Sequence, residues 1–207
     1  AEVQDLYDNA PTGYHSLDRE GRFISINQTE LDWLGYSREE ILGHSFQDFI
    51  TENSDQTFQD VFPVFKKDGK ISNLEFEIRR KDGSTFPVMI NAMAALDENG
   101  QFLSSRSTMT DITVRKQAED ELKRNINFTS ALLNAVPTPV FYKDKSGEYL
   151  GCNHAFSELM GIAPNEIRGK SVFDLWPNEN AVLFHNKDQE LLKTQERQVY
   201  ESEITDK

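Results

Sequence analysis

The sequence predicts an α+β fold that occurs twice, as two copies of one domain with an antiparallel sheet and helices on one face. The first observation is an internal repeat: residues 11–49 align with residues 137–175 without a gap, and eleven of the 39 positions are identical. The second is the order of the predicted elements, which is two strands, short helices and three more strands. The third is a pair of hairpin turns, "KDGS" and "DENGQ", between those later strands.

Each copy opens with two short strands joined by a turn that contains Asp and Gly. In the first copy the strands are residues 13–17 and 22–26, and in the second they are residues 140–143 and 148–152. Glycine in such a turn adopts backbone angles that larger residues resist. The spacing therefore predicts the same hairpin at the start of both domains.

Helices are predicted after each hairpin. Asn27 and Asn153 stand where a helix N-cap is needed, and Gly35 and Gly161 stand where the helix ends. A longer helix is predicted over about residues 53–67 of the first copy. The alternating segments "NLEFEIRR", "TFPVMINAMAAL" and "FLSSRSTMTDIT" then complete the first domain as strands.

The repeat divides the chain into a first domain of residues 1–113, a connecting helix of residues 114–133 and a second domain of residues 134–207. The stretch from residue 114 to residue 136 has no Gly or Pro, and its apolar positions recur at steps of three and four. These positions are Ala118, Leu122, Ile126, Thr129, Leu133 and Val136. The pattern predicts an amphipathic helix.

Composition excludes several classes of function. The net charge of −13 disfavours nucleic acid and anionic membrane surfaces as partners. A single cysteine, Cys152, excludes a disulfide framework and a cysteine-rich metal site. No apolar run is long enough for a membrane span, so we expect no membrane insertion and a cytoplasmic location.

Enzyme signatures are missing from the sequence. Gly169, Lys170 and Ser171 end like a phosphate-binding loop, but Pro164 stands where the first glycine of that motif belongs. The four histidines lack metal-ligand spacing, and no nucleophile elbow is present. We therefore expect that this part of the protein is not an enzyme and holds no catalytic residue and no metal.

Several motifs resemble the PAS domain family. They are the stretch "GYSREEILG", the hairpin "RRKDGSTFPV" and the terminal "DIT" of the first copy, with "NHAFSELMG" and "EIRGKSVFDL" in the second. The resemblance implies two PAS folds, each a five-stranded antiparallel sheet that encloses a pocket with its helices. It also implies a sensory input region of a bacterial sensor histidine kinase. The second domain matches only up to Lys207, so we expect it to be truncated and its C-terminal strands to be missing.

The resemblance also places a pocket in the first domain. Its first strand would aim His15 and Leu17 inward, where the second copy has Phe141 and Lys143. Strand alternation adds Phe76 and Ser105 to the inward set. The residues predicted to bind a cofactor are His15, Leu17, Trp33, Ser45, Phe49, Ile78, Val88, Ile90, Ala92, Ser107 and Met109. Small side chains in this set predict open space, and the sequence leaves open whether His15 is functional or an ordinary core histidine.

The cofactor predicted by this resemblance is non-covalent FAD in the first domain, as in the redox-sensing PAS domains of nitrogen-fixation and methane-oxidation regulators. Light-sensing flavin domains carry a reactive cysteine where this chain has Phe46, and haem-binding domains carry a histidine on the long helix, where residues 53–67 have none. No cofactor is predicted for the second domain. His15 and Ser107 would carry the redox signal to the connecting helix.

Partners follow from the same resemblance. Connecting helices of this kind often pair with a second protomer, so we expect a homodimer through the PAS domains and the helix, with a kinase domain downstream in the same chain. A helix that packs only on its own domain is an equal alternative. The second hypothesis for function is a module without cofactor, used for dimerisation, for protein interaction or for binding a small metabolite.

Overall fold

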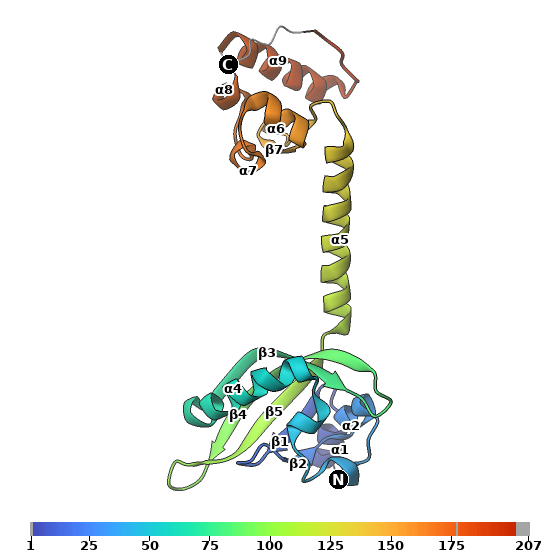
Figure 1. The fold of residues 1–207 in the computed structure, drawn as a ribbon, viewed down its shortest axis with the longest axis vertical. Coiled ribbons are helices and arrows are strands. Elements are labelled where there is room, and N and C mark those ends of the chain that lie inside the picture. The colour runs from blue at the N-terminus through green and yellow to red at the C-terminus, as the bar shows by residue number, and fades with distance from the viewer. Residues whose placement is uncertain (1, 177, 202–207) are drawn as a thin grey trace. The chain divides into compact units, whose positions relative to one another are not determined.

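The structure, a computed structural model, describes residues 2–176 and 178–201 of the chain (Figure 1). The chain forms two compact units, residues 1–120 and residues 121–207. Each unit has its own cluster of buried apolar side chains. Within the described ranges, none of the helices is both long and apolar enough to cross a membrane.

A five-stranded antiparallel sheet forms the centre of the first unit, which confirms the predicted α+β fold. Its strands are β1 (Gly13–Leu17), β2 (Phe23–Ile26), β3 (Lys70–Arg79), β4 (Thr85–Leu96) and β5 (Phe102–Asp111). They lie in the order β2-β1-β5-β4-β3. The helices are α1 (Glu2–Asp8), α2 (Gln28–Leu34), α3 (Arg38–Ile41), the 3-10 helix η1 (Phe46–Phe49) and α4 (Glu52–Asp68). Because β5 pairs with both β1 and β4, the last strand joins the two halves of the sheet.

The predicted helix cap, helix end and hairpin turn are confirmed by local hydrogen bonds and backbone angles. Asn27 caps α2, since its Oδ1 accepts a hydrogen bond from the backbone N–H of Glu30 at 3.1 Å. Gly35 ends the same helix with φ of +75°, an angle that favours glycine. In the hairpin between β3 and β4, Oδ1 of Asp82 accepts a hydrogen bond from the backbone N–H of Ser84 at 2.9 Å. These short-range bonds set the ends of the elements.

The predicted alternation along the three long strands is also confirmed. All inward positions are buried, namely Phe76, Ile78, Val88, Ile90, Ala92, Ser105, Ser107 and Met109. Strand pairing sets Ile90 opposite Met109 and Ala92 opposite Ser107, so these side chains share one face of the sheet. That face carries the core of the first unit.

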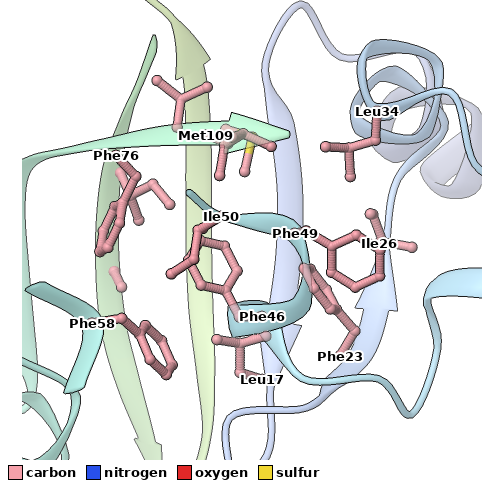
Figure 2. Close-up of a cluster of buried hydrophobic side chains, with 14 of the residues drawn as sticks. Leu17, Phe23, Ile26, Leu34, Phe46, Phe49, Ile50, Phe58, Phe76 and Met109 are labelled. Carbon is pink, nitrogen blue, oxygen red and sulfur yellow. The ribbon is translucent and has the colours of Figure 1, made fainter. Parts of the chain in front are cut away.

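Phenylalanine side chains dominate this core (Figure 2). Phe46 lies at its centre, with Phe58 and Phe76 on one side and Phe23 and Phe49 on the other. The ring centroid of Phe46 is 5.2 Å from that of Phe58, 5.5 Å from that of Phe76 and 5.8 Å from that of Phe23. These distances fall in the usual range for interacting aromatic pairs, so η1 is held by packing on both sides.

The second unit repeats the beginning of the first. It contains β6 (Phe141–Lys143), β7 (Tyr149–Cys152), α6 (His154–Met160), α7 (Pro164–Ile167), α8 (Val172–Leu175) and α9 (Asn178–Thr194). In the described part, β6 and β7 form a two-stranded sheet. The third strand that the repeat predicts would include residues 203–204, which lie outside the described residues. With no described strand beyond β6, Phe141 is 43% exposed although its ring contacts those of Tyr149 and Phe156.

The connecting helix is α5 (Thr113–Ala135), which compares with residues 114–133 in the prediction. None of its residues is buried. Leu122 and Ile126, two members of the predicted apolar stripe, are 62% and 59% exposed. The stripe therefore lacks the cover that an apolar helix face usually has.

Candidate functional site

A small cavity lies between the sheet and the helices of the first unit. Its volume is about 30 Å³, which is room for about one water molecule. Five of the fourteen lining residues are phenylalanines, namely Phe46, Phe58, Phe62, Phe65 and Phe76. The polar residues at the wall are His15, Ser105 and Ser107. The predicted pocket is therefore found where it was expected, but protein side chains fill most of it.

Five of the eleven residues predicted for the cofactor site line this cavity. They are His15, Leu17, Ile90, Ala92 and Ser107. The structure places the other six elsewhere in the first unit, namely Trp33, Ser45, Phe49, Ile78, Val88 and Met109. Of these, Ile78, Val88 and Met109 are buried in the strands without reaching the cavity wall.

Local roles account for the remaining three. Trp33 is half-buried against the core, and its carbonyl oxygen accepts a hydrogen bond from Nε of Arg80 at 2.8 Å. Ser45 is the N-cap of η1, since its Oγ accepts a hydrogen bond from the backbone N–H of Gln47 at 3.3 Å. Phe49 packs edge-on against the ring of Tyr36 with centroids 5.2 Å apart. Each of these side chains has a structural task.

The prediction of open space in the first domain is wrong for a definite reason. Small residues on β4 and β5 do leave room on the sheet, but Phe58, Phe62 and Phe65 of α4 occupy that room. They recur at steps of four and three residues, which places them on one face of the helix. Filling the space is favourable because an empty cavity costs packing energy.

The hydroxyl groups at the cavity are already paired within the protein. The backbone N–H of Leu17 donates a hydrogen bond to Oγ of Ser105 at 2.9 Å. Oγ of Ser107 donates to the same Ser105 oxygen at 3.0 Å. The first of these bonds joins β1 to β5, and the second lies within β5, so both hydroxyl groups are satisfied inside the sheet.

His15 forms a buried pair with Glu30, a residue that the sequence analysis did not single out. The exposed fractions are 3% for His15 and 0% for Glu30. Nδ1 of the imidazole lies 2.9 Å from Oε1 and 3.1 Å from Oε2 of the carboxylate. Oε1 has no hydrogen bond of good geometry in the described structure. The rings of Phe23 and Phe46 contact the imidazole at centroid distances of 5.3 and 5.7 Å.

Gly13 makes room for this carboxylate. A Cβ atom at that position would stand 2.9 Å from Oε2 of Glu30 and 3.1 Å from its Cβ. A signal for Glu30 was available in the repeat, because the aligned residue of the second copy is Phe156, which is buried. A charged residue where the other copy buries an aromatic ring indicates a polar site inside the core.

The residues present do not fit a flavin. Ligand pockets typically enclose about 300–1,000 Å³, and the cavity beside His15 encloses about 30 Å³. Phe46 and Phe58 stand with ring centroids 5.2 Å apart where a ring system would have to lie. No step of a mechanism is therefore assigned to FAD.

The second unit has a larger, open pocket of about 310 Å³. Aromatic residues line it, with Tyr149 and Trp176 joined by a hydrogen bond from indole Nε1 to the phenol oxygen at 3.0 Å. Burial raises the pKa of Tyr149 to about 12. Lys143 lies over the rings of Phe141 and Tyr149 and pairs with Asp188 at 2.6 Å. Lys143 and Asp188 thus stand at the positions that align with Leu17 and Phe62 of the first copy.

Cys152 behaves as a small apolar residue of the second unit. It is half-buried and packs against the second core. Burial raises the pKa of its thiol, and a raised pKa lowers the fraction of reactive thiolate. It also lines an open groove with Tyr142 and three members of the α5 stripe, Ile126, Thr129 and Leu133.

Two family models match the chain, one in each half. The model described as "PAS domain" matches residues 11–114, and the model described as "PAS fold" matches residues 133–206. Among curated proteins, the chain is similar to the phosphoserine phosphatase RsbP of Bacillus subtilis, with 28% identity over 116 residues. It is also similar to the virulence sensor protein BvgS of Bordetella pertussis, with 32% identity over 71 residues. The matches cover 55% and 34% of this chain, but only 28% of RsbP and 5% of BvgS.

Solved structures show the same fold. A PAS domain from Colwellia psychrerythraea superposes with a TM-score of 0.50 and 20% identity, over 54% of this chain and 95% of that chain. An RNA-binding Light-Oxygen-Voltage receptor superposes with a TM-score of 0.54 and 15% identity, over 61% of this chain and 36% of that chain. At these identities the likeness shows the fold and nothing about ligands.

Proposed function

Because the chain belongs to the PAS domain family, with one such domain in each half, we propose that it is the signal-input region of a larger signalling protein. In this proposal the first domain works without a cofactor, and α5 carries its conformational state onward and pairs with a second copy of the chain. The observation that carries the proposal is the uncovered apolar stripe on a 23-residue helix that has no buried residue. The similarity to RsbP and BvgS supports a signalling context.

Ion pairs tie the start of α5 to the sheet. The carboxylate of Glu75 on β3 lies 2.5 Å from Arg115 and 2.6 Å from Lys116, both in the first turns of α5. Hydrogen bonds from Lys116 and Arg115 lower the pKa of Glu75, so its carboxylate is ionised at neutral pH. The backbone N–H of Ile112 also donates to the carbonyl oxygen of Pro87 on β4. A shift of β3 or β4 would therefore move the helix.

Dimerisation through α5 is tested by placing charge on the stripe. We expect the double variant Leu122→Glu with Ile126→Glu to be monomeric, because two carboxylates in each helix would have to be buried in the apolar seam. Light scattering after gel filtration measures the mass. The matched control is Gln117→Glu with Ala131→Glu, which adds the same charge to the opposite side of the helix. A mass equal to that of the unchanged chain in the stripe variant would contradict the proposal.

FAD, which the sequence predicted for the first domain, is not part of this proposal. The filled cavity supports a colourless protein, and we expect no flavin absorption in the visible spectrum after gentle purification. Added FAD should separate from the protein on gel filtration. A yellow protein that keeps its colour through this step would overturn the expectation, since Phe46 and Phe58 would then have to move out of the cavity.

Three further expectations from the sequence stay predictions. They are a histidine kinase as the output domain, a cytoplasmic location, and a second domain that binds no cofactor. The first two fit the signalling context, and the third fits the proposal. The chain covers 28% of RsbP and 5% of BvgS, so the activity of the whole protein is itself a proposal.

A further inference from the structure

We propose that His15 and Glu30 form a proton-binding site, which holds one proton in the folded first domain and makes its stability respond to pH. This inference is independent of the dimer proposed above. It rests on the geometry of the pair: both side chains are shielded from water, and nitrogen and oxygen are within 3.1 Å. Within the described residues, His15 is the only cationic partner within 4 Å of Glu30.

Other charged and titratable groups lie around the pair on neighbouring elements. From α1 come Tyr7 and Asp8, and from α3 comes Arg38, which pairs with Asp8 at 3.2 Å. Burial raises the pKa of Tyr7, with a smaller contribution in the same direction from the charge of Glu30, so the phenol stays neutral. The elements η1 and β5 present the ring of Phe46 and the hydroxyl of Ser107. Arg106 of β5 and Tyr14 of β1 line an open pocket that His15 also lines, and both residues are exposed to water. Charge balance at the site therefore depends on the pair itself.

Burial favours one proton over none or two. With one proton, the pair is either an ion pair or two neutral groups, and its net charge is zero. Loss of that proton would leave a carboxylate alone in the core, and a second proton would leave an imidazolium alone. A lone buried charge is costly, so both changes oppose folding. The paired state needs no such charge and is retained over a wide pH range.

The sign of the pH dependence follows from the proton count of the unfolded chain. Unfolded glutamate and histidine titrate near about 4.3 and 6.5. Between these values both states hold one proton, so this site leaves stability constant. Above about pH 6.5 the unfolded histidine loses its proton while the folded pair keeps one, so stability falls as pH rises, by about tenfold in the folding equilibrium constant per pH unit. The full contribution is thus present between about pH 4.3 and about pH 6.5, and it falls off on either side of this range.

The second domain supplies an internal comparison. The residues aligned with His15 and Glu30 are Phe141 and Phe156, whose ring centroids are 4.9 Å apart. Two phenylalanines hold no proton at this place. The repeat has therefore kept one shape and changed the site from a polar pair to an apolar one, and only the first domain has the proposed proton site.

The experiment uses the full chain and monitors the unfolding of its first domain only. The chain has two tryptophans, Trp33 in the first domain and Trp176 in the second, so the Trp176→Phe background leaves Trp33 as the fluorescence reporter. Urea unfolding is measured from about pH 5.5 to about pH 8.5 in this background, with and without Glu30→Gln. Glutamine keeps the size and an acceptor oxygen but carries no charge. We expect the extra loss of stability, about tenfold per pH unit above about pH 6.5, to disappear in Glu30→Gln.

Equal pH slopes in the two proteins would overturn the proposal. Should Glu30→Gln not fold, the double variant His15→Phe with Glu30→Phe copies the second domain and is compared in the same way. Should this variant also not fold, the pH slope of the unchanged site decides: a flat profile between about pH 6.5 and about pH 8.5 contradicts a retained proton.

Discussion

Replacing Asn27 by alanine is expected to lower the free energy of unfolding of the first domain by about 4 kcal/mol, because four backbone groups lose their hydrogen bond to this fully buried amide at once. Oδ1 of Asn27 accepts hydrogen bonds from the backbone N–H groups of Tyr14 and Glu30, at 2.9 and 3.1 Å. Its Nδ2 donates to the carbonyl oxygens of Tyr7 and Thr12, at 2.9 and 3.0 Å. One side chain therefore joins α1, β1 and α2. Urea unfolding, followed by Trp33 fluorescence in the Trp176→Phe background, measures the change.

The chain offers two matched controls for this variant. Asn27→Asp keeps both acceptor bonds but sets a buried carboxylate oxygen against the carbonyl oxygens of Tyr7 and Thr12, so we expect it not to restore stability at neutral pH. Asn153 plays the same part in the second domain, where its Oδ1 accepts hydrogen bonds from the backbone N–H groups of Val140 and Phe156. Asn153→Ala should weaken the second domain and leave the Trp33 transition unchanged. A loss below about 1 kcal/mol in Asn27→Ala would mean that water replaces the amide, and the assigned role would be wrong.

Replacing Phe46 by alanine is expected to cost the first domain about 3–5 kcal/mol, the usual range for a buried phenylalanine. Phe46 is 2% exposed and stands at the centre of the aromatic cluster, between Phe23 and Phe58. Its removal would join new space to the small cavity beside His15. Domains of this size have a total stability of about 5–15 kcal/mol, so the variant would be close to unfolding. Thermal and urea unfolding measure the loss.

The enlarged cavity gives this second variant a separate readout. An apolar cavity made by removing a large side chain stays dry and can bind a small aromatic compound such as benzene. We therefore expect benzene to raise the melting temperature of Phe46→Ala and to leave the unchanged chain unaffected. Phe46→Leu, which fills more of the space, should lose less stability and respond less. No response of Phe46→Ala to benzene would show that the core collapses to fill the space.

Sequence patterns with a short reach predicted much of the fold. The repeat identified two domains, alternation placed Ile90 and Met109 on the buried face, and Asn27 marked the start of a helix. Each of these signals depends on residues that are neighbours in the chain or that recur with the period of one element. The predicted pocket was located by the same alternation, since His15 and Leu17 do face the cavity.

The side chains that fill the pocket could not be predicted in this way, because they come from residues far apart in the sequence. Alternation shows that Ala92 and Ser107 leave room on the sheet, but not that Phe58 and Phe62 of a separate helix fill it. The open pocket was therefore the part of the prediction that packing overturned. Volume is a property of all the side chains that meet at one place.

By itself, the sequence determined that this protein has two related domains, the approximate bounds of several of their strands and helices, and which strand positions face inward. Local hydrogen bonding and the period of each element decide these features, so they can be predicted from the order of residues in the sequence. Only the tertiary structure decided that the first pocket is filled with phenylalanine and that His15 meets Glu30 across β1 and α2. The physical reason is that packing and burial act through space: a carboxylate 15 residues away becomes a partner only when the fold excludes water from both groups.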